Sequence, residues 1–182
     1  IFYMGFRLIL DSAMELVDTA WDVDKTNEMK EFINSIEGVD HMHMLRTRKM
    51  GNDVLADVHL QVNSYLSVSE GHYIAEKTMA KLRNKFPELS DLTVHIDPED
   101  DETASLSKTL PSRQALMSTL YPLLQKHSIE EEVKSISLHY INGKIEVELF
   151  LNKTVNETIL AALKTECEDL NEIRILNVFI QA

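Results

Sequence analysis

The sequence predicts an α+β protein made of two αββαβ units, each a sheet with helices on one face only. Helical and strand-like segments follow one another in the order helix, strand, strand, helix, strand, and that order occurs twice. An acidic and then polar run, 99–110, separates the copies and indicates a linker. The predicted units are therefore 23–98 and 111–182, with a leading helix at 1–22, and the pattern is that of ferredoxin-like open-faced sandwiches.

Capping and turn residues bound the elements of the first copy. Asp22 and Asp24 offer N-cap side chains for its second helix, and Gly38 ends that helix. Gly51-Asn52 supplies a turn between two strands, and Pro87 ends the long helix. The predicted elements are helices at 1–21, 25–36 and 67–86, and strands at 40–48, 54–62 and 92–97.

The second copy has the same order of elements with its own turn signal. Asn142-Gly143 is the strongest short hairpin signal in the chain, because both residues accept a positive φ. The predicted elements are helices at 112–126 and 156–170, and strands at 133–141, 144–151 and 173–180. The two copies share this pattern with little identity of residues.

Charge and cysteine content exclude several classes of function. The chain has 30 acidic and 18 basic side chains, a net charge of -12, which argues against nucleic-acid binding because that needs a basic surface. The acidity is compatible with a protein that meets cations. The single cysteine, Cys167, permits no internal disulfide, fits a reducing compartment and excludes a thiolate zinc cluster.

The first ten residues are apolar except for Arg7. No segment reaches the roughly 18 to 20 apolar residues that span a bilayer, and the start has neither an initiator methionine nor a signal-peptide pattern. We interpret residues 1–22 as a helix that continues from a transmembrane segment missing from this chain.

Histidines gather in the first copy. Five of the seven lie between positions 41 and 95, and strand alternation places them on the face opposite the apolar side chains. In the first strand, Met42 and Met44 are the predicted inward pair. The predicted open-face residues are His41, His43, Asp57, His59, His95 and Asp97.

Imidazole and carboxylate donors on neighbouring strands favour a metal site. Strands lie about 4.8 Å apart, close enough for these donors to converge on one or two ions. Such ligands suit Zn²⁺, and also Co²⁺, Ni²⁺, Cd²⁺, Fe²⁺ or Mn²⁺. Asp97 is suited to bridge two ions, and His72 is placed to join from a loop or a second subunit. A single outward histidine is more often a surface residue, so the joint pattern carries the prediction. His127 and His139 lie outside it.

The same segments resemble the cytoplasmic C-terminal domain of the cation diffusion facilitator (cation efflux) family. The resemblance covers about residues 7–98. It rests on five segments of the sequence: Glu15-Leu16-Val17-Asp18-Thr19-Ala20, His43-Met44-Leu45-Arg46-Thr47-Arg48 after Gly38-Val39, Asp57-Val58-His59-Leu60, Ser67-Val68-Ser69-Glu70-Gly71-His72-Tyr73-Ile74-Ala75, and Phe86-Pro87 with Val94-His95-Ile96-Asp97-Pro98.

The resemblance implies a cytoplasmic domain, attached to a transporter of the inner membrane, that forms a homodimer and binds zinc or a related divalent ion. It implies a regulatory role in metal efflux and no enzymatic activity. The positions that correspond to family ligands are His43, His59, His72, His95 and Asp97. Met44 departs from the pattern, since an aspartate is usual there, and His41 is an additional imidazole.

Two alternatives remain open from the sequence. One is a soluble ferredoxin-like module that binds metal or a small molecule without a transporter, and the other is a zinc hydrolase using His59, His95 and Asp97. Pattern alignment places Ser137 at the position of His43, Glu148 at that of His59, and Phe179 and Gln181 at those of His95 and Asp97. The second copy is therefore expected to lack the site.

Overall fold

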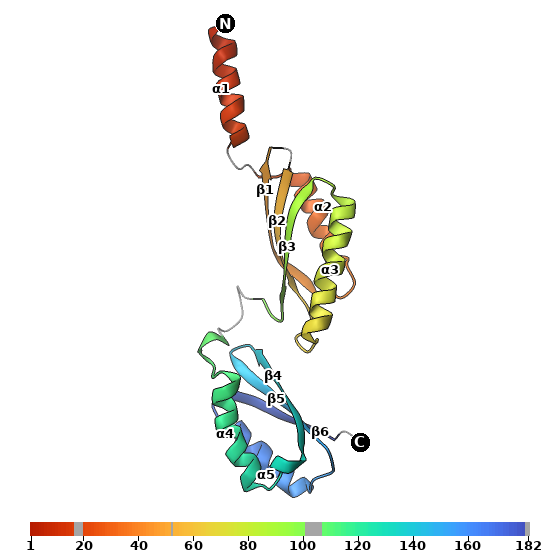
Figure 1. The fold of residues 1–182 in the computed structure, drawn as a ribbon, viewed down its shortest axis with the longest axis vertical. Coiled ribbons are helices and arrows are strands. Elements are labelled where there is room, and N and C mark those ends of the chain that lie inside the picture. Colours follow the sequence, from red (N-terminus) through yellow and green to blue (C-terminus); the bar gives the residue numbers. More distant parts are fainter. Residues whose placement is uncertain (17–19, 52, 101–106, 181–182) are drawn as a thin grey trace. The chain divides into compact units, whose positions relative to one another are not determined.

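The structure is a computed structural model that describes residues 1–16, 20–51, 53–100 and 107–180. The chain forms two compact units, Ile1–Asp100 and Asp101–Ala182. Within the described residues, each unit contains one three-stranded sheet with helices on one face (Figure 1). The predicted α+β class with two αββαβ units is confirmed. Most of the predicted linker, at 101–106, lies outside the described residues.

The first unit is built around the central strand β2. Its elements are α1 (Phe2–Leu16), α2 (Val23–Asn34), β1 (His41–Met50), β2 (Asp53–Gln61), α3 (Val68–Lys85) and β3 (Leu89–Asp97). β2 pairs antiparallel with β1 and parallel with β3. Both α2 and α3 lie on one face of this sheet, which leaves the opposite face open (Figure 1).

Caps and a glycine position the two helices. The Asp22 carboxylate accepts a hydrogen bond from the Lys25 backbone amide at 3.0 Å, and Ser67 caps α3 in the same way through Glu70. After α2 the chain reverses at Gly38, where φ is +90° and an added Cβ would lie 3.0 Å from Ile74. Glycine is required there by the backbone conformation and by this close approach.

Trp21 corrects the predicted end of the first helix. α1 is described to Leu16, residues 17–19 lie outside the described residues, and 20–22 are not helical. Trp21 is buried and packs edge-on against Phe86, with ring centroids 5.8 Å apart. Burying the indole in this core removes a large apolar surface from water, which favours the non-helical backbone at 20–22.

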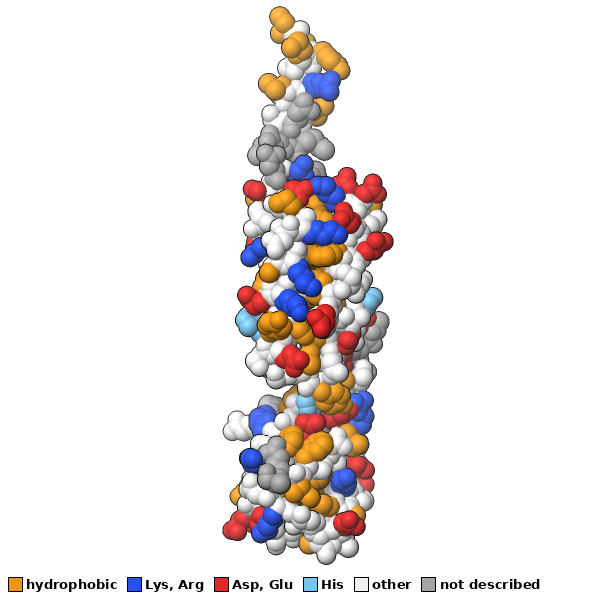
Figure 2. Space-filling model, turned by 90° about the vertical axis from the view of Figure 1, so that its right-hand side faces the viewer, with side chains coloured by type: hydrophobic (Ala, Val, Ile, Leu, Met, Phe, Trp, Pro, Cys, Tyr) orange, Lys and Arg blue, Asp and Glu red, His pale blue; other side chains and the backbone are white. Residues whose placement is uncertain are grey.

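The α1 helix carries exposed apolar side chains, visible as the hydrophobic group at the N-terminal end in Figure 2. Phe2, Tyr3, Met4 and Leu8 are each more than two-thirds exposed. Among the helices that the structure describes, none combines the length and the apolar character required to cross a bilayer.

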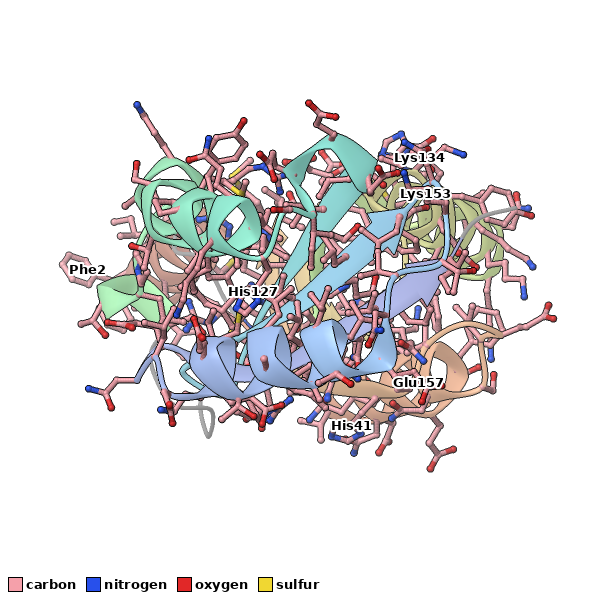
Figure 3. All side chains as sticks on the ribbon, turned by 90° about the horizontal axis from the view of Figure 1, so that it is seen from below. Phe2, His41, His127, Lys134, Lys153 and Glu157 are labelled. Atoms are coloured by element: carbon pink, nitrogen blue, oxygen red, sulfur yellow. The ribbon has the colours of Figure 1, made fainter. Side chains whose placement is uncertain are left out.

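The second unit repeats the topology. Its elements are η1 (Ser107–Thr109), α4 (Arg113–Lys126), η2 (Glu130–Glu132), β4 (Val133–Ile141), β5 (Lys144–Leu151), α5 (Glu157–Glu168) and β6 (Ile173–Ile180). β5 is the central strand and pairs antiparallel with β4 and parallel with β6. The predicted hairpin turn is confirmed: Asn142 and Gly143 have φ of 52° and 67°. α5 begins at Glu157, which Figure 3 labels.

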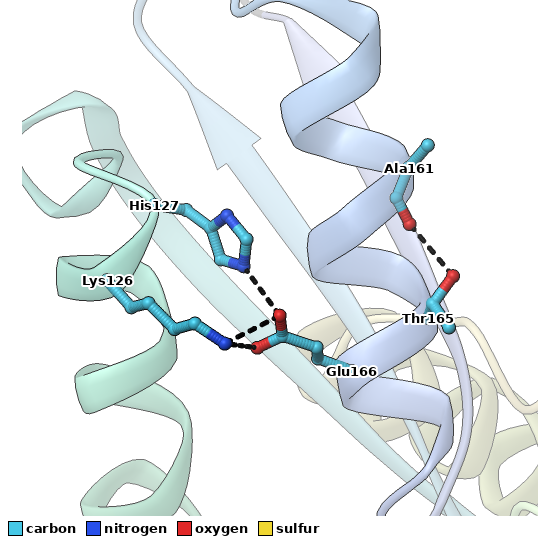
Figure 4. Close-up of polar contacts among 5 residues, drawn as sticks. All are labelled: Lys126, His127, Ala161, Thr165 and Glu166. Carbon is cyan, nitrogen blue, oxygen red and sulfur yellow. Dashed lines mark hydrogen bonds and ion pairs between the residues drawn. The ribbon is translucent and has the colours of Figure 1, made fainter.

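A polar cluster joins α4 to α5 (Figure 4). The Glu166 carboxylate accepts hydrogen bonds from Lys126 Nζ at 2.8 and 2.9 Å and lies 3.3 Å from His127 Nε2. The hydrogen bond from Lys126 lowers the pKa of Glu166. The neighbouring Cys167 is fully buried, and burial raises the pKa of its thiol to about 11. Cys167 is therefore part of the hydrophobic core of the second unit.

Candidate metal centre

Strand pairing arranges the polar residues of the open face of the first sheet in rows, because directly paired residues point to the same face. One row is Met44, His59 and His95. The next is His41, Gln61 and Asp97. On the core side, Val58 and Leu60 of β2 are fully buried beneath the helices. The central strand therefore presents His59 outward between two packed core residues.

A β-bulge in β1 corrects the predicted orientation of Met44. The pairing register shifts between Met42 and Met44, so that Met42 pairs with Leu60 on the core side and Met44 pairs with His59 on the open side. Met42 is 8% exposed within the core. Because a bulge inserts one residue into a strand, alternation is interrupted there and Met44 does not point inward.

Three side chains of this face converge. His59 Nδ1 lies 2.9 Å from Asp97 Oδ2, and His43 Nε2 lies 3.3 Å from the same oxygen. The two imidazole rings meet edge-on, with centroids 5.5 Å apart. One donor atom from each of these residues lies within 4.8 Å of the other two. Since two donors bound to one tetrahedral ion at about 2.1 Å lie roughly 3.4 Å apart, small ring movements suffice for one ion to contact all three.

The cluster is partly shielded from solvent. The side chains of His43, Asp97 and His59 are 5%, 17% and 24% exposed. Within the part of the chain that the structure describes, His43 Nδ1 is buried without a hydrogen-bond partner. A buried polar atom without a partner is uncommon in folded proteins, so this nitrogen is a candidate to bind a ligand.

The other four predicted site residues are not members of this donor group. His95 stacks on His59 with centroids 4.4 Å apart and an interplanar angle of 28°, and its side chain is exposed. His41 and Asp57 are exposed on neighbouring rows of the open face. In the strand register, Asp57 of β2 lies opposite Arg46 of β1. His72 is exposed on α3.

The second sheet offers an internal comparison, since its strands carry register shifts at the corresponding places. β4 shifts between Val133 and Ser135, as β1 does between Met42 and Met44. Counting along the paired strands, Phe150 occupies the position of His59 and Lys134 that of His43. The alignment predicted from sequence, with Ser137 and Glu148 at these positions, is wrong.

Phe179 occupies the position of His95, as predicted, and Phe150 and Phe179 stack with centroids 5.1 Å apart. Gln181, predicted at the position of Asp97, lies outside the described residues. His139 lies 3.3 Å from Glu148 on the same face, and Glu146 forms an ion pair with Arg174. An aromatic pair and a lysine thus stand where the first sheet has its three imidazoles, so the described part of this face lacks the ligand set.

The first unit belongs to the class of open-faced α+β domains that carry an imidazole–carboxylate cluster on the open face of the sheet. Comparison with known proteins relates this unit to a family. Residues 21–99 match the family model described as cation efflux protein, cytoplasmic domain. The resemblance predicted for this segment, to the cytoplasmic domain of the cation efflux family, is confirmed.

Several named relatives agree with this assignment. Metal tolerance protein C1 of Arabidopsis thaliana is 26% identical over 181 residues, 91% of this chain and 38% of that protein. Metal tolerance protein 2 of Oryza sativa subsp. japonica is 36% identical over 50% of this chain and 24% of its own length. The cation-efflux pump FieF of Pectobacterium atrosepticum is 32% identical over 54% and 32%. The chain thus spans well under half the length of these relatives, and the first match includes the second unit.

Solved structures of MamM CTD are also similar. A cadmium form is 27% identical over 41% of this chain and 91% of that chain, with a TM-score of 0.39. A manganese form is 29% identical over 40% and 92%, with the same TM-score. At this TM-score the structures carry no weight in the assignment, which rests on the sequence match.

Proposed function

We propose that residues 21–99 bind a divalent cation through His43, His59 and Asp97, and that this binding regulates metal efflux by the transporter to which the domain belongs. The convergence of the three donors, within 4.8 Å of one another, carries the proposal. Support for the transport role comes from relatives that are named as metal tolerance proteins and cation-efflux pumps.

The donor set decides the class of ion. Neutral imidazole nitrogen with carboxylate oxygen suits Zn²⁺ and, with differing affinity, Co²⁺, Ni²⁺, Cd²⁺, Fe²⁺ and Mn²⁺. An ion at Asp97 Oδ2 would replace the contact between this oxygen and His59 Nδ1. Asp97 is the last residue of β3, so the ion would tie the end of this edge strand to β1 and β2.

Regulation follows from differential affinity. A cation that binds one conformation of the transporter more tightly shifts the population toward it, and by no more than the difference in binding free energy. We propose that the domain forms a homodimer on the cytoplasmic side of the membrane and that the bound ion favours its closed form. The ion would lower the repulsion among acidic groups in a chain of net charge -12.

Calorimetric titration of the chain with Zn²⁺ tests the proposal. We expect saturable binding that is lost in the double variant His43→Ala, His59→Ala. The matched control is His139→Ala, because this histidine lies on β4 of the second unit, outside the cluster. Binding that persists in the double variant, or that disappears in the control, would show that the ion does not occupy this site. Sedimentation of the same samples with and without Zn²⁺ would then measure dimer formation.

A further inference from the structure

β6 is an edge strand of the second sheet, and within the described residues it pairs only with β5. An edge strand exposes a row of backbone amides and carbonyls, which proteins normally protect with charged side chains, prolines, bulges or covering segments. From 175 to 180 the register of β6 against β5 is continuous, and this run contains neither a proline nor a charged residue. The preceding Arg174 is engaged within its own sheet by an ion pair with Glu146. The run 175–180 therefore lacks the usual protection of an edge.

The other edge strands of the two sheets carry such protection. A segment next to β4 covers part of its outer edge, where Arg113 Nη2 of α4 donates a hydrogen bond to the Ile136 carbonyl at 2.8 Å. In the first sheet the edge strands β1 and β3 carry exposed charged side chains, among them Arg46, Arg48 and Asp91. Among the edges that the structure describes, β6 thus stands out as suited to pair with another strand.

The side chains of β6 are complementary to those of a second, antiparallel copy of the same strand. Ile175 and Phe179 are 37% and 43% exposed, and both lie on the open face of the sheet. If a two-fold axis passes beside Asn177, Ile175 of each copy lies opposite Phe179 of the other. Pairs of an aromatic and a β-branched side chain stabilise antiparallel strands when they are directly opposite. In the same register Leu176 lies opposite Val178 on the core side, so both faces pair apolar with apolar.

We propose that β6 is a dimerisation strand, through which two copies of the chain pair antiparallel over residues 175–180 and join their second sheets into one continuous sheet. Such a contact is isologous, because each copy contributes the same strand to it. The pairing needs no metal ion, so it goes beyond the proposed function and does not depend on it. It gives the second unit a role in assembly, although the described part of its open face lacks the ligand set of the first unit.

Disulfide cross-linking on the two-fold axis tests this register. In a Cys167→Ala background, Asn177→Cys places one thiol in each copy at directly paired positions. The Cα atoms of such pairs lie about 4.5 to 5.5 Å apart, a separation that a disulfide spans. Ser135→Cys, an exposed position on β4 of the same sheet, is the matched control. With diamide as oxidant and EDTA present, we expect Asn177→Cys to form covalent dimer at least about tenfold faster than the control.

A charge exchange tests the facing of Ile175 and Phe179. Added to the Asn177→Cys chain, Ile175→Lys with Phe179→Lys places lysine opposite lysine, whereas Ile175→Lys with Phe179→Glu places lysine opposite glutamate. Both variants remove the same apolar side chains. We expect the first to cross-link about tenfold more slowly than the second, because like charges directly opposite one another destabilise paired strands.

Equal cross-linking rates at positions 177 and 135, or equal rates in the two charge variants, overturn the proposal. A chain that stays monomeric and does not cross-link would leave β6 to a strand of a different protein, and it also overturns the proposal. Cross-linking that is retained in the His43→Ala, His59→Ala variant supports it. A chain that cross-links through position 177 but binds no Zn²⁺ supports this inference and overturns only the function proposed above.

Discussion

His59 and Phe150 occupy equivalent positions on the open faces of two sheets with the same topology and corresponding bulges. His59 contacts Asp97 and stacks on His95, whereas Phe150 stacks on Phe179. The two units therefore share one sheet topology, but the side chains on their open faces differ in chemistry. In the first unit this position holds a metal-binding type of side chain, and in the second it provides an aromatic contact.

Removing the charge of Asp97 should abolish most of the metal affinity. Its Oδ2 atom is the point that both imidazoles approach, at 2.9 and 3.3 Å. We expect Asp97→Asn to weaken Zn²⁺ binding by about a hundredfold or more, since an anionic ligand is lost. Asp57→Asn, an exposed carboxylate on the same face, is the control and should bind as the parent does. Equal losses in both variants would indicate a diffuse electrostatic effect.

Acidification should release the ion. Histidine binds metal only in its neutral form, so protons compete with the ion as the pH falls. We expect Zn²⁺ affinity to fall by at least about tenfold between pH 7.5 and 5.5, with proton release measured on binding at pH 6. An affinity that is constant over this range would exclude His43 and His59 as ligands.

Bound Zn²⁺ should stabilise the first unit and leave the second unchanged. A ligand that binds only the folded state adds about 2.7 kcal/mol at a free concentration of 100 Kd. Trp21 is the single tryptophan and is buried in the first unit, so its fluorescence reports unfolding of that unit in urea. Cys167 is buried in the second unit, and its reaction with a thiol reagent reports unfolding there.

We expect the urea midpoint from Trp21 fluorescence to rise with Zn²⁺, while the denaturant dependence of Cys167 labelling stays fixed. A shift of Cys167 labelling alone would place the ion in the second unit. The His43→Ala, His59→Ala variant is the control, and its Trp21 transition should not respond to the ion.

Alkaline pH should destabilise the second unit through Cys167. Burial raises the pKa of this thiol to about 11, compared with about 8.5 in an unfolded chain. Between these values the unfolded state has lost the proton that the folded state keeps, so the free energy of unfolding falls as pH rises. We expect a loss of up to about 3 kcal/mol between pH 8.5 and 11.

Cys167→Ala is the matched variant for this measurement, because it removes the titrating group. Its stability should decrease less over the same pH interval than that of the parent. Parallel decreases in the two proteins would assign the alkaline sensitivity to other groups.

The order of elements was predictable because turn and cap residues are local. Asn142-Gly143 and the Asp22 cap act through their own backbone neighbourhoods, and the strands at 133–141, 144–151 and 173–180 agree with the structure residue for residue. The His43, His59 and Asp97 group was within reach of strand alternation, since each residue lies on a different strand of one sheet.

What escaped prediction depends on non-local pairing. The bulge before Met44 leaves no signal in alternation, because it is set by the register against β2. The same register decides that Phe150 corresponds to His59, two residues from the position inferred along the sequence. The apolar periodicity of the preceding residues predicts a helix that reaches Trp21. The burial of Trp21 against Phe86, however, depends on residues far along the chain.

The most direct test of the central claim is a crystal structure of the chain with Zn²⁺, located by anomalous scattering at the zinc absorption edge. We predict a peak about 2.0 to 2.2 Å from a nitrogen of His43, a nitrogen of His59 and an oxygen of Asp97. Peaks only at other histidines, such as His72 or His127, with His59 still hydrogen-bonded to Asp97, would contradict it.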